Sequence, residues 1–439
     1  MAGDWINWSL GQLCDLRAGT VFKPAFQGKT SGNYPFIKVS DMNLPANAVK
    51  IQDSNNWVSG GDLLALKAKP FPPGTVVFAK IGEALRQNRL RHVVRETVID
   101  NNMMGAVPDR SRVDPIFFYY ALSQFDFAKI AQGTALPYLT VTSLSALALD
   151  VPPVPEQRAI AHILGTLDDK IELNRRMNET LEAIARAIFK SWFVDFDPVH
   201  AKASGEPPES ICRRLGLTPD LLALFPDRLV DSELGEIPEG WEVKTLSQIT
   251  SYLNRGIAPK YMENGGVLVL NQKCVRDGRV DTSKARRHDP EQRSVAGRLL
   301  EVGDVLVNST GVGTLGRVAQ VLALDEPTIV DSHVTVVRAD AQEVSWNYLG
   351  VALLERETEI EALGEGSTGQ TELSRSRLSD LKLTIPPSPL RERFDKSVLP
   401  LRLQTKRNDE QAATLASIRD GLLPKLLSGE LRVPLEATA

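Results

Sequence analysis

Residues 144–155 read LSALALDVPPVP, and residues 378–389 read LSDLKLTIPPSP. The leucines, the serine and three prolines recur at an offset of 234 residues, which is 378 − 144. The offset continues past the prolines in three further pairs: Asn174 with Asn408, Leu181 with Leu415, and Ile184 with Ile418. Solenoid repeats are ~20 to 50 residues long, so this period indicates a duplicated domain with its connector. The sequence therefore predicts a pseudo-dimer on one chain.

The segments upstream of these motifs also match, with small drifts in the offset. Trp8 matches Trp241 at an offset of 233. Three pairs match at 231: Gly82 with Gly313, Arg86 with Arg317, and Asp100 with Asp331. Short strand-like runs lie at 34–39, 75–79 and 93–99 in the first half and at 267–270, 304–307 and 329–337 in the second. Each half is expected to begin with a strand-rich globule, and loop insertions explain the drift.

A long helical segment ends each half and begins after the Pro-Pro pair, because proline suits an extended approach and the first helical turn. Apolar residues and asparagines recur there every seven residues, with a second row offset by four, as in a coiled-coil seam. The residues expected to pair the helices are Leu167, Asn174, Leu181 and Ile188 in the first segment and Leu401, Asn408, Leu415 and Leu422 in the second. Pro400 is expected to break or kink the start of the second helix.

Asparagines within both seams predict a fixed register, since a buried asparagine specifies register at some cost in stability. The alternative is that Asn174, Asn178 and Asn408 face water where the pairing loosens. A helix from Glu156 to Phe193 would be roughly 55 Å long at ~1.5 Å per residue. Each helix must return toward the opposite globule, so we expect antiparallel pairing. The predicted fold class is α+β, with two strand-rich globules in a pseudo-twofold repeat, separated by two long helices that form an antiparallel coiled coil.

The composition is that of an ordinary globular protein. Hydrophobic residues make up 42% and charged residues 24% of the 439 residues, which argues against disorder and collagen. Cys14, Cys212 and Cys274 lack a CxxC spacing, so they predict neither a disulfide framework nor a zinc site. Without a signal-peptide pattern or a run of ~20 apolar residues, a cytoplasmic location is expected. The net charge of −4 conceals basic clusters at 80–95 and 273–298, although such runs are usually solvated faces.

Three further motifs point to a known family. They read VPEQR at 154–158 with LDDKIELN at 167–174 and SWFVDFDP at 191–198, then LFPD at 224–227 with SELGEIPEGW at 232–241, and finally LLPKLLSG at 422–429. These motifs resemble the conserved regions of type I restriction-modification specificity (S) subunits. The resemblance divides the chain into a first target recognition domain (1–153), a first spacer helix (154–195), a connector (196–238), a second target recognition domain (239–387), a second spacer helix (388–428) and a tail (429–439).

The resemblance implies a DNA-sequence reader in which each target recognition domain judges one half of a bipartite double-stranded site. The helices would dock two modification subunits, which methylate adenine with S-adenosylmethionine, and an ATP- and Mg-dependent restriction subunit could join them. The chain carries no GxxxxGK[ST] loop and no Asn/Asp-Pro-Pro-aromatic motif, so this chemistry is expected on the partners. The chain itself is expected to bind no cofactor and no metal, and to catalyse no reaction. The alternative function is a coiled-coil assembly adaptor that reads no sequence.

Candidate DNA contacts lie in loops at the ends of the predicted strands. Arg317 and Thr314 belong to a glycine loop at 311–317, and Arg86 and Lys80 belong to its counterpart at 80–86. Arginine can donate a bidentate pair to guanine or hold a phosphate, so the two arginines are the leading candidates. The remaining candidates are Lys38 and Lys273, near the ends of early strands, and Tyr138 and Gln370, in two equivalent loops.

Three other patterns resemble enzyme or metal sites without the required context. Gly311, Gly313 and Gly316 satisfy GxGxxG, but the residues after Arg317 predict a strand, whereas a dinucleotide fingerprint must open a helix. The carboxylates and lysine of 226–244 resemble a nuclease signature, but they span a connector without a rigid platform. The five histidines never occur at ligand spacing.

Overall fold

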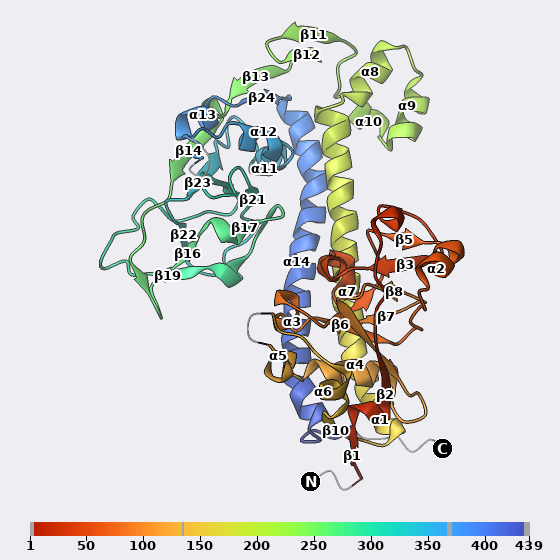
Figure 1. The fold of residues 1–439 in the computed structure, drawn as a ribbon. Helices are drawn as coiled ribbons and strands as arrows, with labels where there is room; N and C mark the ends of the chain where they lie inside the picture. The colour runs from red at the N-terminus through yellow and green to blue at the C-terminus, as the bar shows by residue number, and fades with distance from the viewer. Residues whose placement is uncertain (1–3, 134–135, 367–370, 434–439) are drawn as a thin grey trace. The chain divides into compact units, whose positions relative to one another are not determined.

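The computed structural model describes residues 4–133, 136–366 and 371–433. The chain divides into two compact units, and each is described by itself below. Unit 1 comprises Met1–Asn174 and Glu410–Ala439, and unit 2 comprises Arg175–Asp409. Two long helices belong to both, so each unit contains one globule together with part of each helix (Figure 1).

The long helices are α7 (Val154–Phe193) and α14 (Ser388–Leu427), each of 40 residues. They run in opposite directions, because partners later in α7 contact residues earlier in α14. These contacts join Asp168 to Arg419 and Asn174 to Gln411 in unit 1, and Asn178 to Asn408 and Phe189 to Phe394 in unit 2. The predicted antiparallel pair of helices is confirmed.

Pro400 does not break α14, which begins at Ser388, so the predicted break is wrong. Proline within a helix removes one hydrogen bond and costs ~3 kcal/mol or more. Phe394 and Val398 lie on the turn and a half before Pro400, and both are 0% exposed. Their burial in the core of unit 2 keeps this part of the chain helical.

A five-stranded sheet in the order β2-β9-β6-β7-β4 is the centre of the globule in unit 1. A three-stranded sheet, β5-β3-β8, and the pair β1-β10 complete it. Phe117, Ile160 and Leu164 are fully buried in one core, which joins the globule to the start of α7. The elements are β1 (Ile6–Ser9), α1 (Leu10–Leu13), β2 (Cys14–Ala18), β3 (Tyr34–Ile37), β4 (Lys50–Ile51), β5 (Trp57–Val58), α2 (Gly60–Leu66), β6 (Val76–Ala79), α3 (Glu83–Arg86), β7 (Leu90–Val93), β8 (Val98–Ile99), β9 (Met103–Pro108), α4 (Pro115–Ser123), α5 (Phe127–Ile130), α6 (Val141–Ser145) and β10 (Ala148–Val151).

Unit 2 has two four-stranded sheets, β14-β23-β20-β21 and β15-β19-β16-β22, and the pairs β13-β24, β17-β18 and β11-β12. The segment 196–238, predicted as a connector, contains three helices and a hairpin. The elements are α8 (Asp197–Ala203), α9 (Pro208–Leu215), α10 (Pro219–Leu222), β11 (Leu229–Ser232), β12 (Gly235–Pro238), β13 (Glu242–Thr245), β14 (Thr250–Arg255), β15 (Tyr261–Met262), β16 (Val267–Leu270), β17 (Val275–Arg276), β18 (Arg279–Val280), β19 (Arg286–His288), β20 (Val305–Asn308), β21 (Val318–Gln320), β22 (Thr328–Val330), β23 (Val334–Ala339), α11 (Trp346–Leu354), α12 (Glu357–Ala362), α13 (Arg375–Ser379) and β24 (Lys382–Ile385).

The two globules have the same order and pairing of strands (their strand plan), as the repeat predicts. In unit 1, β6 lies between β9 and β7, and in unit 2, β20 lies between β23 and β21. The parallel pair β3-β8 corresponds to β16-β22, and the antiparallel pair β1-β10 corresponds to β13-β24. The predicted α+β fold with duplicated strand-rich globules is confirmed. In the part of the chain that is described, no helix is long and apolar enough to cross a membrane.

Two of the predicted strands are interrupted. The run 93–99 splits between β7 and β8, and the run 329–337 splits between β22 and β23. In the second case the carboxylate of Asp331 accepts the backbone N–H of His333 at 2.9 Å, which closes an Asx turn. This local hydrogen bond competes with the strand ladder, and apolar patterning alone does not reveal it.

Candidate nucleic-acid interface

In unit 1 the loop after β6 lies against the loop that contains Tyr138. The N–H of Leu139 donates to the carbonyl of Lys80 at 2.8 Å, and the N–H of Gly82 donates to that of Pro137 at 2.8 Å. Gly82 has a φ of 76°, a left-handed conformation that glycine adopts without the steric penalty of a side chain. The side chain of Tyr138 is 42% exposed. The structure therefore brings two predicted DNA contacts, Lys80 and Tyr138, to neighbouring backbone positions with an exposed aromatic ring.

The glycine loop of unit 2 occupies the same place in its strand plan. Leu373 donates its N–H to the carbonyl of Ser309 at 2.8 Å, as Leu139 does to Lys80. Arg317 donates from Nη2 to the carbonyl of Gly313 at 2.9 Å, and Thr314 is the next residue of this loop. The chain then enters β21 and not a helix, so the loop lacks the helix N-terminus that a dinucleotide site requires. Gln370 lies outside the described residues.

Strand pairing changes the predicted match between Arg86 and Arg317. Phe78 of β6 pairs with Leu90 of β7, and Val307 of β20 pairs with Val318 of β21. Leu90 and Val318 therefore hold equivalent positions, and the residues just before them are Arg89 and Arg317. Arg86 lies three residues earlier, at the end of α3, where it pairs with Glu83 at 3.4 Å. Sequence matching missed Arg89 because the two loops differ in length.

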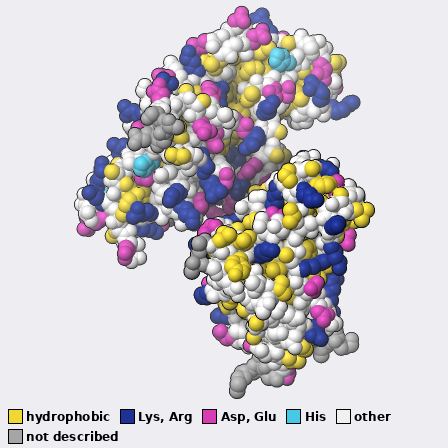
Figure 2. Space-filling view, in the orientation of Figure 1, with side chains coloured by type: hydrophobic (Ala, Val, Ile, Leu, Met, Phe, Trp, Pro, Cys, Tyr) yellow, Lys and Arg dark blue, Asp and Glu magenta, His cyan; other side chains and the backbone are white. Residues whose placement is uncertain are grey.

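The two candidate lysines lie in different surroundings. Lys38 follows β3, donates to Gln27 Oε1 at 2.6 Å and lies 5.3 Å from the centre of the Phe22 ring. Lys273 lies in a short 3-10 turn, where its side chain is exposed. The backbone position of Lys38 corresponds to Asn271, because Ile37 and Leu270 accept equivalent hydrogen bonds from Asp100 and Asp331. Figure 2 shows lysine and arginine side chains on the surface of both units, with acidic side chains among them.

The helix seam buries its asparagines. Asn174, Asn178 and Asn408 are 1%, 2% and 4% exposed, so they do not face water. Asn408 donates to Asn178 Oδ1 at 2.8 Å within unit 2, and Asn174 donates to Gln411 Oε1 at 2.9 Å within unit 1. The other predicted pairing residues, Leu167, Leu181, Ile188, Leu401, Leu415 and Leu422, are half-buried. The row offset by four is deeper, since Leu164, Ala185, Trp192, Val398 and Leu426 are all buried.

Comparisons with known proteins cover nearly the whole chain. The family model described as type I restriction modification DNA specificity domain matches residues 2–183. The HindI specificity subunit of Haemophilus influenzae is 26% identical over 98% of this chain and 100% of its own length. The MjaIX specificity subunit of Methanocaldococcus jannaschii is 26% identical over 93% of this chain and 87% of its own length. The chain is therefore similar, over nearly its whole length, to specificity subunits of type I restriction enzymes.

A solved structure of this family has the same fold. The crystal structure of the type I S subunit from M. genitalium covers 96% of both chains with a TM-score of 0.61 at 16% sequence identity. The relatives are named as specificity subunits and not as catalytic subunits, which agrees with the expectation that this chain catalyses no reaction. Among the described residues, no group of three or more His, Cys, Asp or Glu could hold a metal ion.

Each globule contains a buried carboxylate that the sequence repeat matched but to which it gave no role. Asp100 and Asp331 are 9% and 3% exposed, and burial raises the pKa of both above the usual range of aspartate. A Cβ on Gly256 would lie 2.4 Å from the carbonyl oxygen of Asp331, and one on Gly19 would lie 2.1 Å from that of Asp100. Glycine is needed at positions 19 and 256, because the backbone there lies too close to the backbone of the buried aspartate for any side chain to fit.

Asp331→Asn is expected to stabilise the protein at neutral pH by about 1 kcal/mol. Because burial raises the pKa of Asp331 in the folded chain, stability is lost as the pH rises from the unfolded pKa to the folded pKa, and the loss is complete above the folded pKa. Asparagine keeps the acceptor for the His333 N–H without the charge. Thermal unfolding from pH 7 down to pH 3 measures the effect, and the gain should shrink as the pH falls.

Asp289→Asn is the matched control, because Asp289 caps a similar turn through the N–H of Glu291 at 2.9 Å but is only half-buried. Hydrogen bonds, first that from Gln292, lower its pKa. Its replacement should give no gain at neutral pH. An equal gain in both variants would contradict the explanation by burial.

Proposed function

We propose that this specificity subunit reads a bipartite double-stranded DNA target, with each globule judging one half-site. The duplicated strand plan carries the proposal, because it presents the same pair of loops in unit 1 and in unit 2. A reader of a split site needs two similar recognition surfaces at a controlled separation. The paired helices α7 and α14 are proposed to act as the spacer between them.

The loops supply side chains with the right chemistry for DNA. Arg317 and Arg89 enter the equivalent strands, and arginine can read guanine bidentately or hold a phosphate. Contacts with the phosphate backbone of the DNA are proposed to position the duplex, and they would come from Thr314, Lys80, Lys38 and Lys273. Tyr138 offers an exposed ring, and its equivalent Glu372 pairs with Arg255. The two half-sites are therefore proposed to differ in sequence.

Modification subunits are proposed to dock on a patch that recurs on the two helices. Ile184 on α7 and Ile418 on α14 are related by the repeat and are 44% and 46% exposed. Each has an exposed small residue and an exposed threonine beside it: Ala183 with Thr180, and Ser417 with Thr414. Equivalent patches support two copies of one partner. A restriction/translocase subunit is proposed to join this assembly.

The cofactors are proposed to act on the partners. S-adenosylmethionine would bind to the modification subunits, and ATP with Mg²⁺ to the restriction subunit. Methylation of a base in duplex DNA requires the base to leave the stack. A specificity subunit that grips both half-sites would hold the duplex while its partner extrudes the base.

A genome-wide map of N6-methyladenine tests the proposed function. Cells that contain this chain with its modification partner are compared with cells that lack only this chain. A split motif that disappears on deletion supports the proposal and supplies both half-sites. If the motif is unchanged, or if the purified complex binds random DNA without selection, the chain reads no sequence and the adaptor function is favoured.

Arg317→Ala is expected to relax one position of one half-site and to leave the other half-site intact. A bidentate contact from arginine to guanine is worth ~1–3 kcal/mol of discrimination against the wrong base. Methylation of a randomised target library measures the change. Arg276→Ala is the control, because Arg276 is an exposed arginine of the same globule that pairs with its neighbour Asp277 at 3.3 Å. An unaltered motif in the Arg317 variant would remove Arg317 from the recognition surface.

A further inference from the structure

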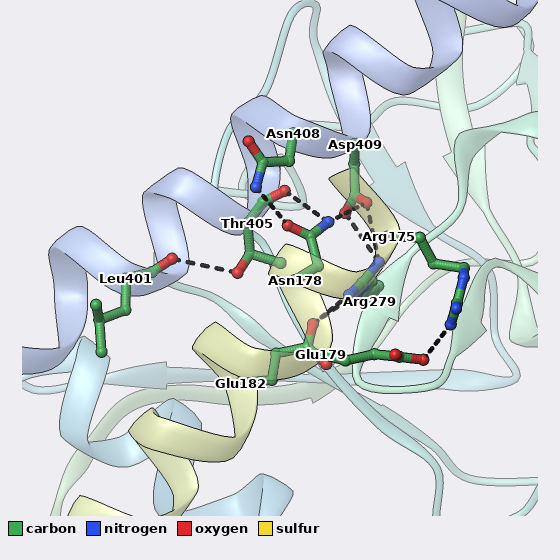
Figure 3. A network of polar contacts seen from close by, with 9 residues as sticks. All are labelled: Arg175, Asn178, Glu179, Glu182, Arg279, Leu401, Thr405, Asn408 and Asp409. Atoms are coloured by element: carbon green, nitrogen blue, oxygen red, sulfur yellow. Dashed lines mark hydrogen bonds and ion pairs between the residues drawn. The ribbon is translucent and has the colours of Figure 1, made fainter. Parts of the chain in front are cut away.

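Arg279 links the globule of unit 2 to both long helices. Its Nη1 lies 3.0 Å from Asp409 Oδ1 and 3.1 Å from Oδ2 on α14, and its Nε donates to Glu182 Oε1 on α7 at 3.0 Å (Figure 3). The Nη2 atom also pairs with Glu182. The planar guanidinium therefore bridges two carboxylates on different helices, which the rigid fork of arginine favours.

A tight hairpin places Arg279 at this position. Val275 pairs with Val280, and Arg276 pairs with Arg279. The loop between them is Asp277-Gly278, with φ of 51° and 74°, as a two-residue hairpin loop with positive φ at both residues requires. Arg279 therefore projects from a short, defined turn, which fixes the position of its backbone relative to the rest of the hairpin.

The contacts continue from Arg279 to the asparagines of the seam. Asp409 Oδ1 also accepts a hydrogen bond from Asn178 Nδ2 at 2.7 Å. The same amide nitrogen lies 3.2 Å from the carbonyl of Thr405, and Asn178 Oδ1 accepts from Asn408 at 2.8 Å (Figure 3). Since buried asparagines set the register of a helix pair, Arg279 is connected to the residues that define this register.

The equivalent residue in unit 1 has a different chemistry. Gln320 of β21 corresponds to His92 of β7, because they pair with equivalent residues of β20 and β6. Lys50 pairs with His92, and the parallel bridge between Gly278 and Ala319 makes Arg279 the residue equivalent to Lys50. Lys50 pairs with Asp169 on α7. A lysine is a point charge on a flexible stem, whereas the Arg279 fork fixes both distance and orientation. The two globules are thus tied to the helices by unlike contacts.

We propose that Arg279 is a positioning residue that sets the length of DNA between the two half-sites which the specificity subunit accepts. This inference rests on the proposed function. Arg279 joins the hairpin β17-β18 to both helices beside the asparagines that set their register. It thereby sets the position of the unit 2 globule along the paired helices. Loss of the bridge would free the hairpin β17-β18 from the seam asparagines while the rest of the globule stays attached, so targets with a changed gap would become acceptable.

The ion pairs of Arg279 position the globule but contribute little to the stability of the fold. The side chains of Arg279, Glu182 and Asp409 are 39%, 42% and 43% exposed, and exposed ion pairs contribute little to folding. Arg402 of α14 holds the same globule independently, because its Nη1 donates to Gln320 Oε1 at 2.5 Å and to Asn347 Oδ1 at 2.8 Å. The variant Arg279→Ala should therefore fold with its globule still attached.

The test uses the full chain in complex with its modification subunit. Targets carry the two native half-sites with the gap unchanged or altered by one or two base pairs, and methylation of each is measured. For Arg279→Ala we expect the preference for the native gap over a gap one base pair longer to fall by about tenfold, since small misplacements have large effects on positioned reactions. The preferred bases within each half-site should not change.

Three further variants distinguish positioning from other roles. Arg279→Lys keeps the charge without the fork and should recover only part of the gap preference. Glu182→Gln should weaken it in the same direction. Arg228→Ala removes a bidentate pair with Glu239 in the segment before β11 and should leave the gap profile unchanged.

The outcomes separate this inference from the proposed function. If Arg279→Ala methylates targets of each gap length as the wild type does, the positioning role is overturned. If its base preferences change while its preference for gap length does not, Arg279 is a DNA contact and the positioning role is also overturned. If the wild-type complex methylates no split motif, the proposed function fails, and the role of Arg279 fails with it.

Discussion

Replacing Phe394 with alanine is expected to lower the free energy of unfolding of unit 2 by about 3–5 kcal/mol. Phe394 on α14 is fully buried. Its ring centre lies 5.1 Å from that of Phe193 and 5.8 Å from that of Phe189, both on α7, and 6.1 Å from that of Tyr348 on α11. The substitution would therefore leave a cavity where both helices meet the globule.

Urea unfolding of the purified protein, followed by tryptophan fluorescence, measures the loss. Trp192 reports on this site directly, because its ring centre is 6.2 Å from that of Phe394. Phe394→Leu is the matched control, since it keeps most of the buried volume and should cost less than the alanine variant. A loss below about 1 kcal/mol for Phe394→Ala would mean that the aromatic cluster does not hold α14 to unit 2.

The long helices and the duplication could be predicted because both leave periodic signals in the sequence. Seven-residue spacing identifies a helix seam without knowledge of distant contacts, and the seam asparagines are buried in the structure. Pro400 shows the limit of local rules. Its helix-breaking tendency is outweighed by the burial of Phe394 and Val398, and this burial depends on residues of unit 2 far away in the sequence.

The candidate DNA-binding residues were less predictable, because loop residues are equivalent through strand pairing and not through residue count. Arg86 was matched to Arg317 by offset, whereas the β6-β7 and β20-β21 ladders make Arg89 the equivalent residue. The role of Arg279 could not be read from its basic cluster either. Its signal was the Asp277-Gly278 pair, which marks a tight hairpin, but the partners Glu182 and Asp409 become visible only in the folded chain.

Inserting seven residues into both long helices is expected to lengthen the accepted gap by about three base pairs. Seven helical residues add ~10.5 Å at 1.5 Å each, and base pairs along one strand are ~3.4 Å apart. The insertions belong between Asn174 and Arg175 and between Asp409 and Glu410, where the two units divide. There each unit keeps its own seam contacts, and a heptad turns the helix by only ~20° relative to the 3.5-residue repeat. The methylation map of the variant gives the new motif directly.

Insertion of the same heptad into α7 alone is the control for this spacer mechanism. The two helices would then differ in length between the units, so one unit would have to give up its seam register, including either the Asn178–Asn408 or the Asn174–Gln411 contact. We expect this variant to lose sequence-directed methylation, whereas the double insertion retains both half-sites with a longer gap. Retention of the old gap by the double variant would show that the helices do not set the spacing. The half-site sequences must stay the same in that variant, because no loop of either globule is altered.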